Sequence, residues 1–279
     1  MIEKLTSILK ITRPVNVIIT FVSVLVAAAI CLTGKISELN LLLAAFSAAL
    51  AAASGNIIND IYDIEIDKIN RPLRLLPSGK ITEKSAYLLY FVLVILSIGI
   101  SLIISYSAFI IVIFSNLLLL LYSKKIKRIP LLGNITVAFL TGLVFIYGGV
   151  VVQNPSAAII PATFAFLVNL IREIVKDMED VEGDTKAEVI TFPAKYGSQK
   201  SKIIISLITI CLILYTLYPF ITQLYRIEYF VVVMIFVNPI LVYCLKILFQ
   251  DHASKNLNKI SNLLKLSMVF GLIAIFLGV

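Results

Sequence analysis

The chain has 279 residues, of which 60% are hydrophobic and 14% are charged, and its mean hydropathy is +1.02. These values exclude a water-soluble domain of this length, because apolar runs of about 18 or more residues recur along the chain and each is long enough to cross a bilayer. The net charge of +8 does not indicate nucleic-acid binding, since the basic residues gather on one side of the apolar runs. We therefore expect an all-α polytopic membrane protein.

Nine apolar segments predict nine membrane-spanning helices in one bundle. Barrel strands are excluded because the runs are continuous and far longer than the roughly 10 residues of such a strand. The first run is not followed by a cleavage site of small residues, so it predicts a membrane helix and not a removed signal peptide. The predicted spans are about 14–33, 39–58, 84–104, 106–123, 131–152, 157–175, 202–222, 228–249 and 262–279.

The basic residues predict how these spans are oriented. Of the 24 lysines and arginines, 22 lie in the N-terminal segment or near the connections after spans two, four, six and eight, which leaves Lys35 and Arg226 for the other side. The positive-inside rule then places the N-terminus in the cytoplasm. The long connections at about 59–83 and 176–201 lie on the same side, and each is expected to contain a short helix and to cap the bundle. We predict a single domain over residues 1–279 in the cell membrane, with its functional site facing the cytoplasm.

The first long connection begins with several oxygen-bearing side chains. If the second span continues as a helix, Asn59, Asp63 and Asp67 lie at i, i+4 and i+8 on one face, with Asp60 at its flank. Carboxylates at this spacing repel one another unless a cation joins them. Mg²⁺ prefers such oxygens together with substrate phosphates. The pattern therefore predicts a magnesium site.

A second acidic run, Asp177, Asp180 and Asp184, repeats the aspartate spacing of the first at an offset of 117 residues. The two connections and their flanks hold 12 of the 16 acidic residues of the chain. One interpretation is that both are solvated loops whose acids balance nearby lysines and arginines. The matched spacing, each time after a long apolar segment, favours two halves of one metal site.

Basic residues near the acidic runs indicate a phosphate ligand. Arg71 and Arg74 follow the first run, and guanidinium groups suit bidentate contact with phosphate oxygens. Lys127, beyond Tyr122, is the residue that we favour among the basic residues of the next connection. A polyanion at the mouth of an apolar bundle implies an amphiphile such as an isoprenyl diphosphate. Metal ions and basic groups would stabilise the departing pyrophosphate, and aromatic rings would shield the allylic cation.

These motifs resemble those of the UbiA superfamily of intramembrane prenyltransferases. Asn59-Asp60-x-x-Asp63-x-x-x-Asp67 is similar to the first aspartate-rich motif of the superfamily, and Asp177-x-x-Asp180-x-x-x-Asp184 is similar to the second. Nine spans with both motifs after helices two and six match the superfamily along the whole chain. The resemblance implies transfer of a prenyl group from its diphosphate to a lipophilic acceptor, with two Mg²⁺ ions as cofactors.

The resemblance also implies roles for individual residues. It implies that the catalytic and metal-binding residues are Asp63, Asp67, Asp177, Asp180 and Asp184, assisted at the metal by Asn59 and Asp60. It implies that Arg71, Arg74 and Lys127 hold the diphosphate, and we predict that Tyr122 and Asn16 also belong to the diphosphate-binding set. The chain departs from the superfamily at one point, because the position four residues after Tyr122, where a basic residue is usual, is Ile126.

Two longer stretches are similar to the branch of the superfamily that makes digeranylgeranylglyceryl phosphate: residues 67–80, in which Leu75 replaces a usual proline, and residues 172–184. This branch implies transfer of a geranylgeranyl group from geranylgeranyl diphosphate to the free hydroxyl of geranylgeranylglyceryl phosphate, the second ether-bond step of archaeal membrane lipid synthesis. An aspartate of the second run or the released pyrophosphate is expected to take the hydroxyl proton. For the acceptor phosphate we predict contacts with Lys10, Arg13 and Asn16.

Two other functions stay open at the level of sequence. A prenyltransferase of the quinone, haem or chlorophyll type would use an aromatic acceptor and would need no second phosphate site. A secondary transporter would also combine spans with polar residues, but it would bind near the bilayer midplane, where these spans carry almost no ionisable residues. The expected partners are the prenyl diphosphate, the lipidic glycerophosphate and the bilayer, with no nucleic acid and no protein partner implied.

Overall fold

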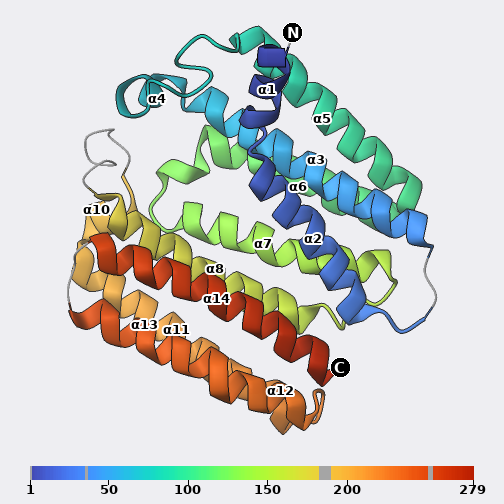
Figure 1. Ribbon diagram of the computed structural model, residues 1–279, viewed down its shortest axis with the longest axis vertical. Coiled ribbons are helices and arrows are strands. Elements are labelled where there is room, and N and C mark those ends of the chain that lie inside the picture. Colours follow the sequence, from blue (N-terminus) through green and yellow to red (C-terminus); the bar gives the residue numbers. More distant parts are fainter. Residues whose placement is uncertain (1, 35–36, 182–189, 251–253) are drawn as a thin grey trace. The chain divides into compact units, whose positions relative to one another are not determined.

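The computed structural model describes residues 2–34, 37–181, 190–250 and 254–279, and these ranges contain helices and no strands (Figure 1). The all-α prediction is confirmed for this part of the chain. A 3₁₀ turn, η1 (Ile126–Arg128), and a π-helical turn, η2 (Val233–Val237), accompany the α-helices. The α-helices are α1 (Ile2–Ile11), α2 (Pro14–Cys31), α3 (Glu38–Tyr62), α4 (Ile64–Asn70), α5 (Glu83–Ile104), α6 (Tyr106–Lys124), α7 (Leu132–Val151), α8 (Ile159–Glu179), α10 (Phe192–Tyr196), α11 (Ser198–Ile221), α12 (Ile227–Val232), α13 (Asn238–Gln250) and α14 (Ser254–Gly278).

Eight helical segments of the described chain are long and apolar enough to cross a membrane, which makes the chain a multi-pass membrane protein. They are α2, α3, α5, α6, α7, α11, the joined helix of α12, η2 and α13, and α14. The predicted span 157–175 coincides with α8, which has 21 residues but carries several charged residues in its last third. The count of nine spans therefore stays a prediction.

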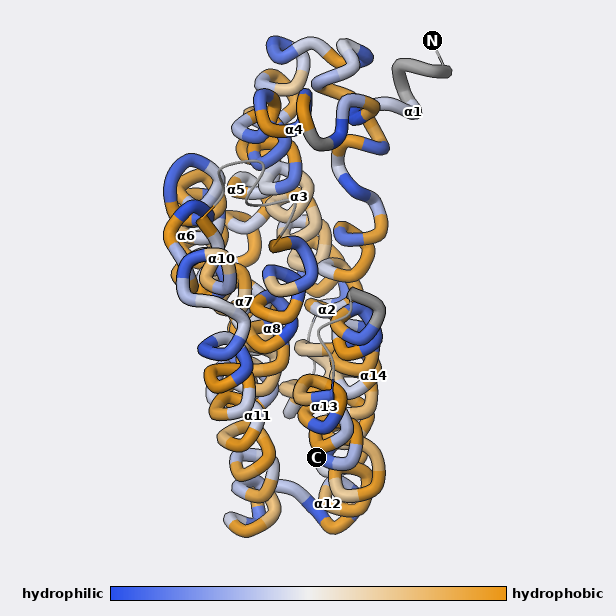
Figure 2. Tube along the Cα trace, turned by 90° about the vertical axis from the view of Figure 1, so that its left-hand side faces the viewer, coloured by the Kyte–Doolittle hydropathy of each residue, from blue (hydrophilic) through white to orange (hydrophobic). Residues whose placement is uncertain are grey.

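The outward faces of these helices are apolar. On α5, Leu88, Ile95 and Ile103 are 68%, 67% and 73% exposed. Apolar surface left in water costs about 25 cal/mol per Å², whereas the same surface in lipid carries no such cost. Figure 2 shows the hydrophobic colour running along the long helices and the hydrophilic colour gathering at the turns between them. This distribution is that of helices surrounded by lipid.

The chain divides into two compact units. The first contains Met1–Lys127 and Val144–Ala158, and the second contains Arg128–Leu143 and Ile159–Val279, so that the boundary falls within α7. The division does not test the expectation of a single domain, which stays a prediction.

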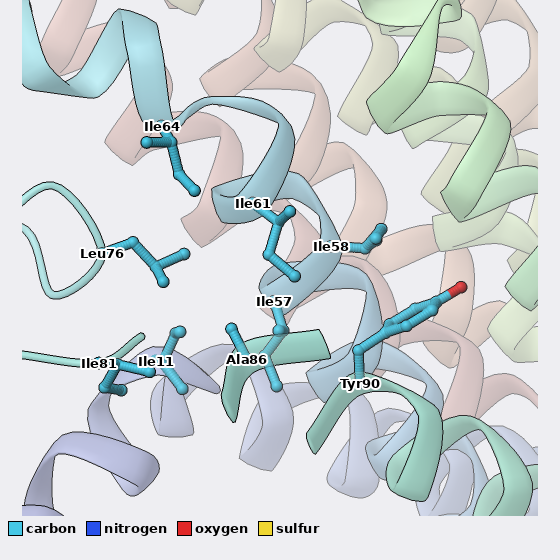
Figure 3. Packing of buried hydrophobic residues seen from close by; sticks show 9 residues of the cluster. All are labelled: Ile11, Ile57, Ile58, Ile61, Ile64, Leu76, Ile81, Ala86 and Tyr90. Carbon is cyan, nitrogen blue, oxygen red and sulfur yellow. The ribbon is translucent and has the colours of Figure 1, made fainter. Parts of the chain in front are cut away.

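In the first unit, α3 packs against α2, α5 and α6. Its interior face is made of small residues, which let the neighbouring helix backbones approach closely. At its C-terminal end, Ile57 and Ile61 join a hydrophobic cluster that includes Ile11 of α1 and Ala86 of α5 (Figure 3). This cluster holds the end of α3 from which the acidic residues project.

A buried polar network also joins α3, α5 and α6. The amide of Asn116 accepts a hydrogen bond from Ser54 Oγ at 3.0 Å and donates to Ser97 Oγ at 3.2 Å. Ser47 Oγ donates to the carbonyl of Ser97 at 2.8 Å. Interhelical hydrogen bonds of this kind add to packing in a membrane interior, where water offers no alternative partner. They fix the register of the three helices around the site.

In the second unit, α14 packs against α8, α12 and α13, and α11 packs against α8 and α13. The buried Tyr229 donates from its hydroxyl to the carbonyl of Thr216 at 2.8 Å, which ties α12 to α11. The turn η2 ends before Pro239, which has no N–H to donate to the preceding turn. The π-helical turn is therefore placed where the regular hydrogen-bond ladder is already interrupted.

A close approach between α7 and α2 generates a test of this packing. A Cβ added at Gly148 would lie 2.5 Å from Ala27 Cβ and 3.0 Å from the backbone nitrogen of Ala28. We expect Gly148→Ala to lower the free energy of unfolding in detergent by about 1–3 kcal/mol, because neither helix can yield without moving its backbone. The matched control is Gly99→Ala on α5, where nothing lies within 4 Å and stability should hold or rise slightly. Equal unfolding midpoints for the two variants would contradict this packing.

Candidate functional site

The first acidic run lies at the junction of α3 and α4. Helix α3 ends at Tyr62, Asp63 adopts φ −98° and ψ 1°, and α4 begins at Ile64. The continuous helix from Asn59 to Asp67, on which the predicted spacing depends, is thus interrupted at Asp63. Aspartate favours such junctions because its short side chain competes with the helical backbone for hydrogen bonds. Backbone bonds from Asp63 N to Asn59 O (3.0 Å) and from Asp67 N to Asp63 O (2.7 Å) nevertheless keep the spacing close to helical.

Two carboxylates of this run have basic partners from later in the chain. Asp63 accepts hydrogen bonds from Lys127 Nζ and, at 3.0 Å, from Asn59 Nδ2. Asp67, which is only 5% exposed, accepts one from Arg74 Nη1 at 2.5 Å. Partly buried charges of this kind are costly unless they are paired. The basic residues that the sequence assigned to a diphosphate thus already contact the acids assigned to a metal.

The third carboxylate, Asp60, has a partner from earlier in the chain. Arg13 donates to it from Nη2, and Arg74 Nη1 lies 3.7 Å from the same oxygen. Arg13 has the left-handed backbone angles φ 55° and ψ 70°, which non-glycine residues adopt rarely. A hydrogen bond from Asn56 Nδ2 to the carbonyl of Thr12 (2.8 Å) holds the same α1–α2 junction against α3. Three carboxylates of the first unit are thereby matched by three cations.

Lys127 is the residue of its basic segment that reaches the acidic run. It lies in η1, is half-buried, and also donates to Asn59 Oδ1 at 3.3 Å. The neighbouring Lys124, Lys125 and Arg128 are exposed. The role of Lys127 stays a prediction, but the structure places its side chain, five residues after Tyr122, against the acidic run. The 3₁₀ turn supplies the extra residue, because it changes the direction of the chain directly after α6.

Among the described residues, the other predicted substrate-binding residues form no ion pair with these three acids, apart from Arg13. Arg71 caps the end of α4 and is exposed, and Tyr122 is half-buried in the last turn of α6. Of the three residues predicted for the acceptor phosphate, Lys10 and Asn16 are exposed, and the guanidinium of Arg13 is paired with Asp60. The Asp60–Arg13 pair was not predicted, because the two residues are 47 positions apart and no local pattern joins them.

The second acidic run follows the end of α8 in the second unit. Asp177 accepts a hydrogen bond from Asn134 Nδ2 of α7 at 2.8 Å. Asp180 comes one residue after the helix and is exposed, while Asp184 lies outside the described residues. Asn134 was missed by sequence reasoning, because a single amide at the start of an apolar segment gives no signal. Its amide holds the Asp177 carboxylate at the start of α7.

The donor set suits a hard cation. In the described part of the chain, no three His, Cys, Asp or Glu side chains gather closely enough to hold a metal ion together. The acids of the first unit are held by basic groups, so each becomes a possible ligand when its basic partner moves to an anion. Carboxylate and amide oxygens without thiolate or imidazole are the ligands that Mg²⁺ accepts. The three cysteines are unpaired and single, with Cys31 and Cys244 buried.

Fold and site together define a helical membrane protein that presents acids and matched bases at the ends of its helices. The sequence model of the UbiA prenyltransferase family matches residues 20–269, which include parts of both units. The chain belongs to the UbiA prenyltransferase family. It is therefore a prenyl-transferring enzyme, and the transporter alternative is set aside.

Several curated relatives extend this similarity over nearly the whole chain. The digeranylgeranylglyceryl phosphate synthase of Methanosphaera stadtmanae is 36% identical over 97% of this chain and 98% of its own. That of Methanocaldococcus jannaschii is 37% identical over 99% of this chain and 97% of its own.

Solved structures agree in fold. A digeranylgeranylglyceryl phosphate synthase structure superposes with a TM-score of 0.83 at 36% identity, covering 99% of this chain and 98% of its own. A UbiA homolog from Archaeoglobus fulgidus bound to GPP and Mg²⁺ superposes with a TM-score of 0.71 at 19% identity, covering 96% and 99%. The second likeness supports the shared fold.

The Asp67–Arg74 pair provides a test of the site without substrate. Because Asp67 is nearly buried and the Arg74 side chain is 28% exposed, we expect a double-mutant cycle of Asp67→Asn and Arg74→Gln to give a coupling energy of about 1.5–3 kcal/mol. Unfolding in detergent without metal is the measurement. The exposed Glu65–Lys68 pair is the matched control and should show no measurable coupling. Coupling of the same size in both pairs would show that burial does not strengthen the site pair.

Proposed function

We propose that this enzyme transfers a geranylgeranyl group from geranylgeranyl diphosphate to the free hydroxyl of geranylgeranylglyceryl phosphate. The observation that carries the proposal is the name shared by relatives 36% and 37% identical to this chain over nearly its whole length. Their product name, digeranylgeranylglyceryl phosphate, describes the proposed acceptor with one more geranylgeranyl chain. The reaction is the second ether-bond step of archaeal membrane lipid synthesis.

We assign both acidic runs to the binding of two Mg²⁺ ions. The proposed ligands are the carboxylates of Asp63 and Asp67 with help from Asn59 and Asp60, and the carboxylates of Asp177, Asp180 and Asp184. When bound, the metal would neutralise charge on the departing diphosphate. The support for a joint role is the repeated spacing of the two runs together with the oxygen-only donor set.

The ion pairs of the first unit suggest how substrate would enter. Lys127 and Arg74 now donate to Asp63 and Asp67. In the proposed complex each base donates to a diphosphate oxygen, and each carboxylate becomes a ligand to metal. Every charge keeps an opposite partner during this exchange, so no buried ion is left unpaired. Arg71, exposed beside this set, would add a further cation, and Tyr122 and Asn16 are proposed to border the donor.

The residues also account for the group transfer itself. The bond between the allylic carbon and the diphosphate oxygen breaks, and the acceptor hydroxyl oxygen bonds to that carbon. The hydroxyl proton passes to an aspartate of the second run or to the pyrophosphate. A cation-like carbon needs little help from a base, which agrees with the absence of histidine from the described site. Apolar helices around the reaction would exclude water, which would otherwise capture the cation.

We also propose that α8 is a ninth membrane span and that the two units form one domain. At 1.5 Å per residue, the 21 residues of α8 extend about 32 Å, which matches a hydrocarbon core of about 30 Å. Charged residues in such a helix are tolerated where they face the interior of a bundle. The one-sided distribution of lysine and arginine supports a cytoplasmic N-terminus and a cytoplasmic site.

The test is prenyl transfer by the purified protein in detergent with labelled geranylgeranyl diphosphate. We expect Mg²⁺-dependent product with geranylgeranylglyceryl phosphate, no product with 4-hydroxybenzoate, and loss of product in EDTA. Asp180→Asn should lower the rate by about 100-fold or more, because a charge that stabilises the leaving group is lost. Glu228→Gln, at the start of α12, is the matched control and should leave the rate unchanged.

Each outcome of this assay has a clear meaning. Product with the aromatic acid alone would overturn the acceptor and keep the donor chemistry. Full activity in EDTA would overturn the metal. Full activity of the Asp180→Asn variant would remove the second acidic run from the proposal.

A further inference from the structure

Helix α8 carries a polar stripe that the diphosphate and metal roles do not use in full. On an ideal helix, with 100° per residue, the polar residues from 169 to 177 fall within an arc of about 140°. The apolar residues of the same stretch fill the other side of the helix and are buried. The stripe consists of Asn169, Arg172, Glu173, Lys176 and Asp177, of which only the last belongs to the acidic motif.

Hydrogen bonds tie this stripe to α7 and link its members. Asn169 Nδ2 donates to Thr141 Oγ1 of α7 at 3.1 Å. Arg172 Nη1 donates to Asn169 Oδ1 at 3.3 Å and to Glu173 Oε1 at 3.0 Å. Lys176 Nζ donates to the same Glu173 oxygen at 3.0 Å. The guanidinium is thereby held in one orientation by groups on both sides.

One donor of this guanidinium has no partner in the part of the chain that the structure describes. Arg172 Nε is buried and bonds to none of the described residues, and the hydrogen bonds that the side chain makes to these residues run through Nη1. A buried donor without an acceptor costs about 1–3 kcal/mol, which an oxygen of a bound anion would offset. The Nε edge of a guanidinium is one side of the fork that binds two oxygens of a phosphate.

The charges nearest Arg172 also suit an anion. Arg172 and Lys176 are positive and Glu173 between them is negative, so these three side chains carry one positive charge in excess. Asp177 makes the whole stripe neutral, but its carboxylate is assigned to the metal. Arg172 precedes Asp177 by five residues, which is about 7.5 Å along the helix axis. Glycerol phosphate carries its phosphate on a carbon next to one that bears a hydroxyl. A phosphate held at Arg172 would therefore keep that hydroxyl close to the stripe, which also carries Asp177.

We propose that Arg172, oriented by Asn169 and Glu173 and assisted by Lys176, forms a second anion subsite that binds the phosphate of the glycerophosphate acceptor. The inference rests on the proposed function. It replaces Arg13 as the cationic contact predicted for this phosphate, since the guanidinium of Arg13 is paired with Asp60. Arg172 lies in a different unit from the Lys127 and Arg74 pairs assigned to the donor. Selection of a phosphorylated acceptor is thereby assigned to α8.

The test uses the purified full chain with Mg²⁺, geranylgeranyl diphosphate, and either geranylgeranylglyceryl phosphate or unphosphorylated geranylgeranylglycerol as acceptor. We expect Arg172→Gln to raise KM for the phosphorylated acceptor by about 10- to 100-fold and to change KM for the donor by less than about 2-fold. In the Arg172→Gln variant, the preference that the wild-type enzyme shows for the phosphorylated acceptor over the unphosphorylated one should disappear. Arg172→Lys should bring the KM for the acceptor part of the way back toward the wild-type value, because an ammonium group restores the positive charge but not the bidentate geometry of the guanidinium.

Controls separate the possible failures. Lys200→Gln changes an exposed lysine in the same unit and should leave both KM values unchanged. If wild type makes no product with the glycerophosphate, the proposed function fails. If wild type is active but Arg172→Gln keeps its acceptor KM, or raises only the donor KM, the subsite is wrong. Should the glutamine variant not fold, Arg172→Lys carries the test, and an unchanged acceptor KM in that variant overturns the subsite.

Discussion

The end of α3 is governed by the need to neutralise three carboxylates that follow an apolar helix. Asp60, Asp63 and Asp67 repel one another at near-helical spacing, and little water is available to screen them. Each is therefore paired with a basic side chain, and the three cations come from three separate parts of the chain. The pairing holds the α1–α2 junction, the segment after α4, and η1 around one helix end.

This constraint connects the fold to the proposed chemistry. Arg13 keeps an unfavourable left-handed backbone because its guanidinium is held at Asp60, and the helix breaks at Asp63, whose carboxylate bonds to Lys127 and Asn59. The bases that neutralise the acids are also those suited to a diphosphate. The same charges can therefore hold the site together without substrate and separate into metal ligands and phosphate ligands in the proposed complex. On α8, the buried Nε of Arg172 extends this pattern to a second anion.

The sequence predicted the membrane helices well, because the thickness of the bilayer sets the length of an apolar run. The errors of this prediction lie in segments whose structure does not depend on the length of an apolar run. Helix α1 was missed because ten amphipathic residues form no apolar run, and α14 begins at Ser254, eight residues before the predicted span, because its first turns are polar but still helical. The acidic runs and Lys127 were predicted from spacing and charge. The basic partner of each acid was not predicted. Lys127 and Asp63, for example, are 64 residues apart, and only the folded chain brings them together.

The most direct measurement of the central claim is calorimetric titration of Mg²⁺ into the wild-type enzyme and the Lys127→Gln variant, both without diphosphate. If Lys127 competes with metal for Asp63, removing it should tighten Mg²⁺ binding by roughly tenfold, or about 1.4 kcal/mol. The same variant should bind a non-reactive diphosphate analogue more weakly, because Lys127 is proposed to donate to it. A variant that binds Mg²⁺ as weakly as wild type, or more weakly, would contradict the claim that Lys127 competes with the metal for the Asp63 carboxylate.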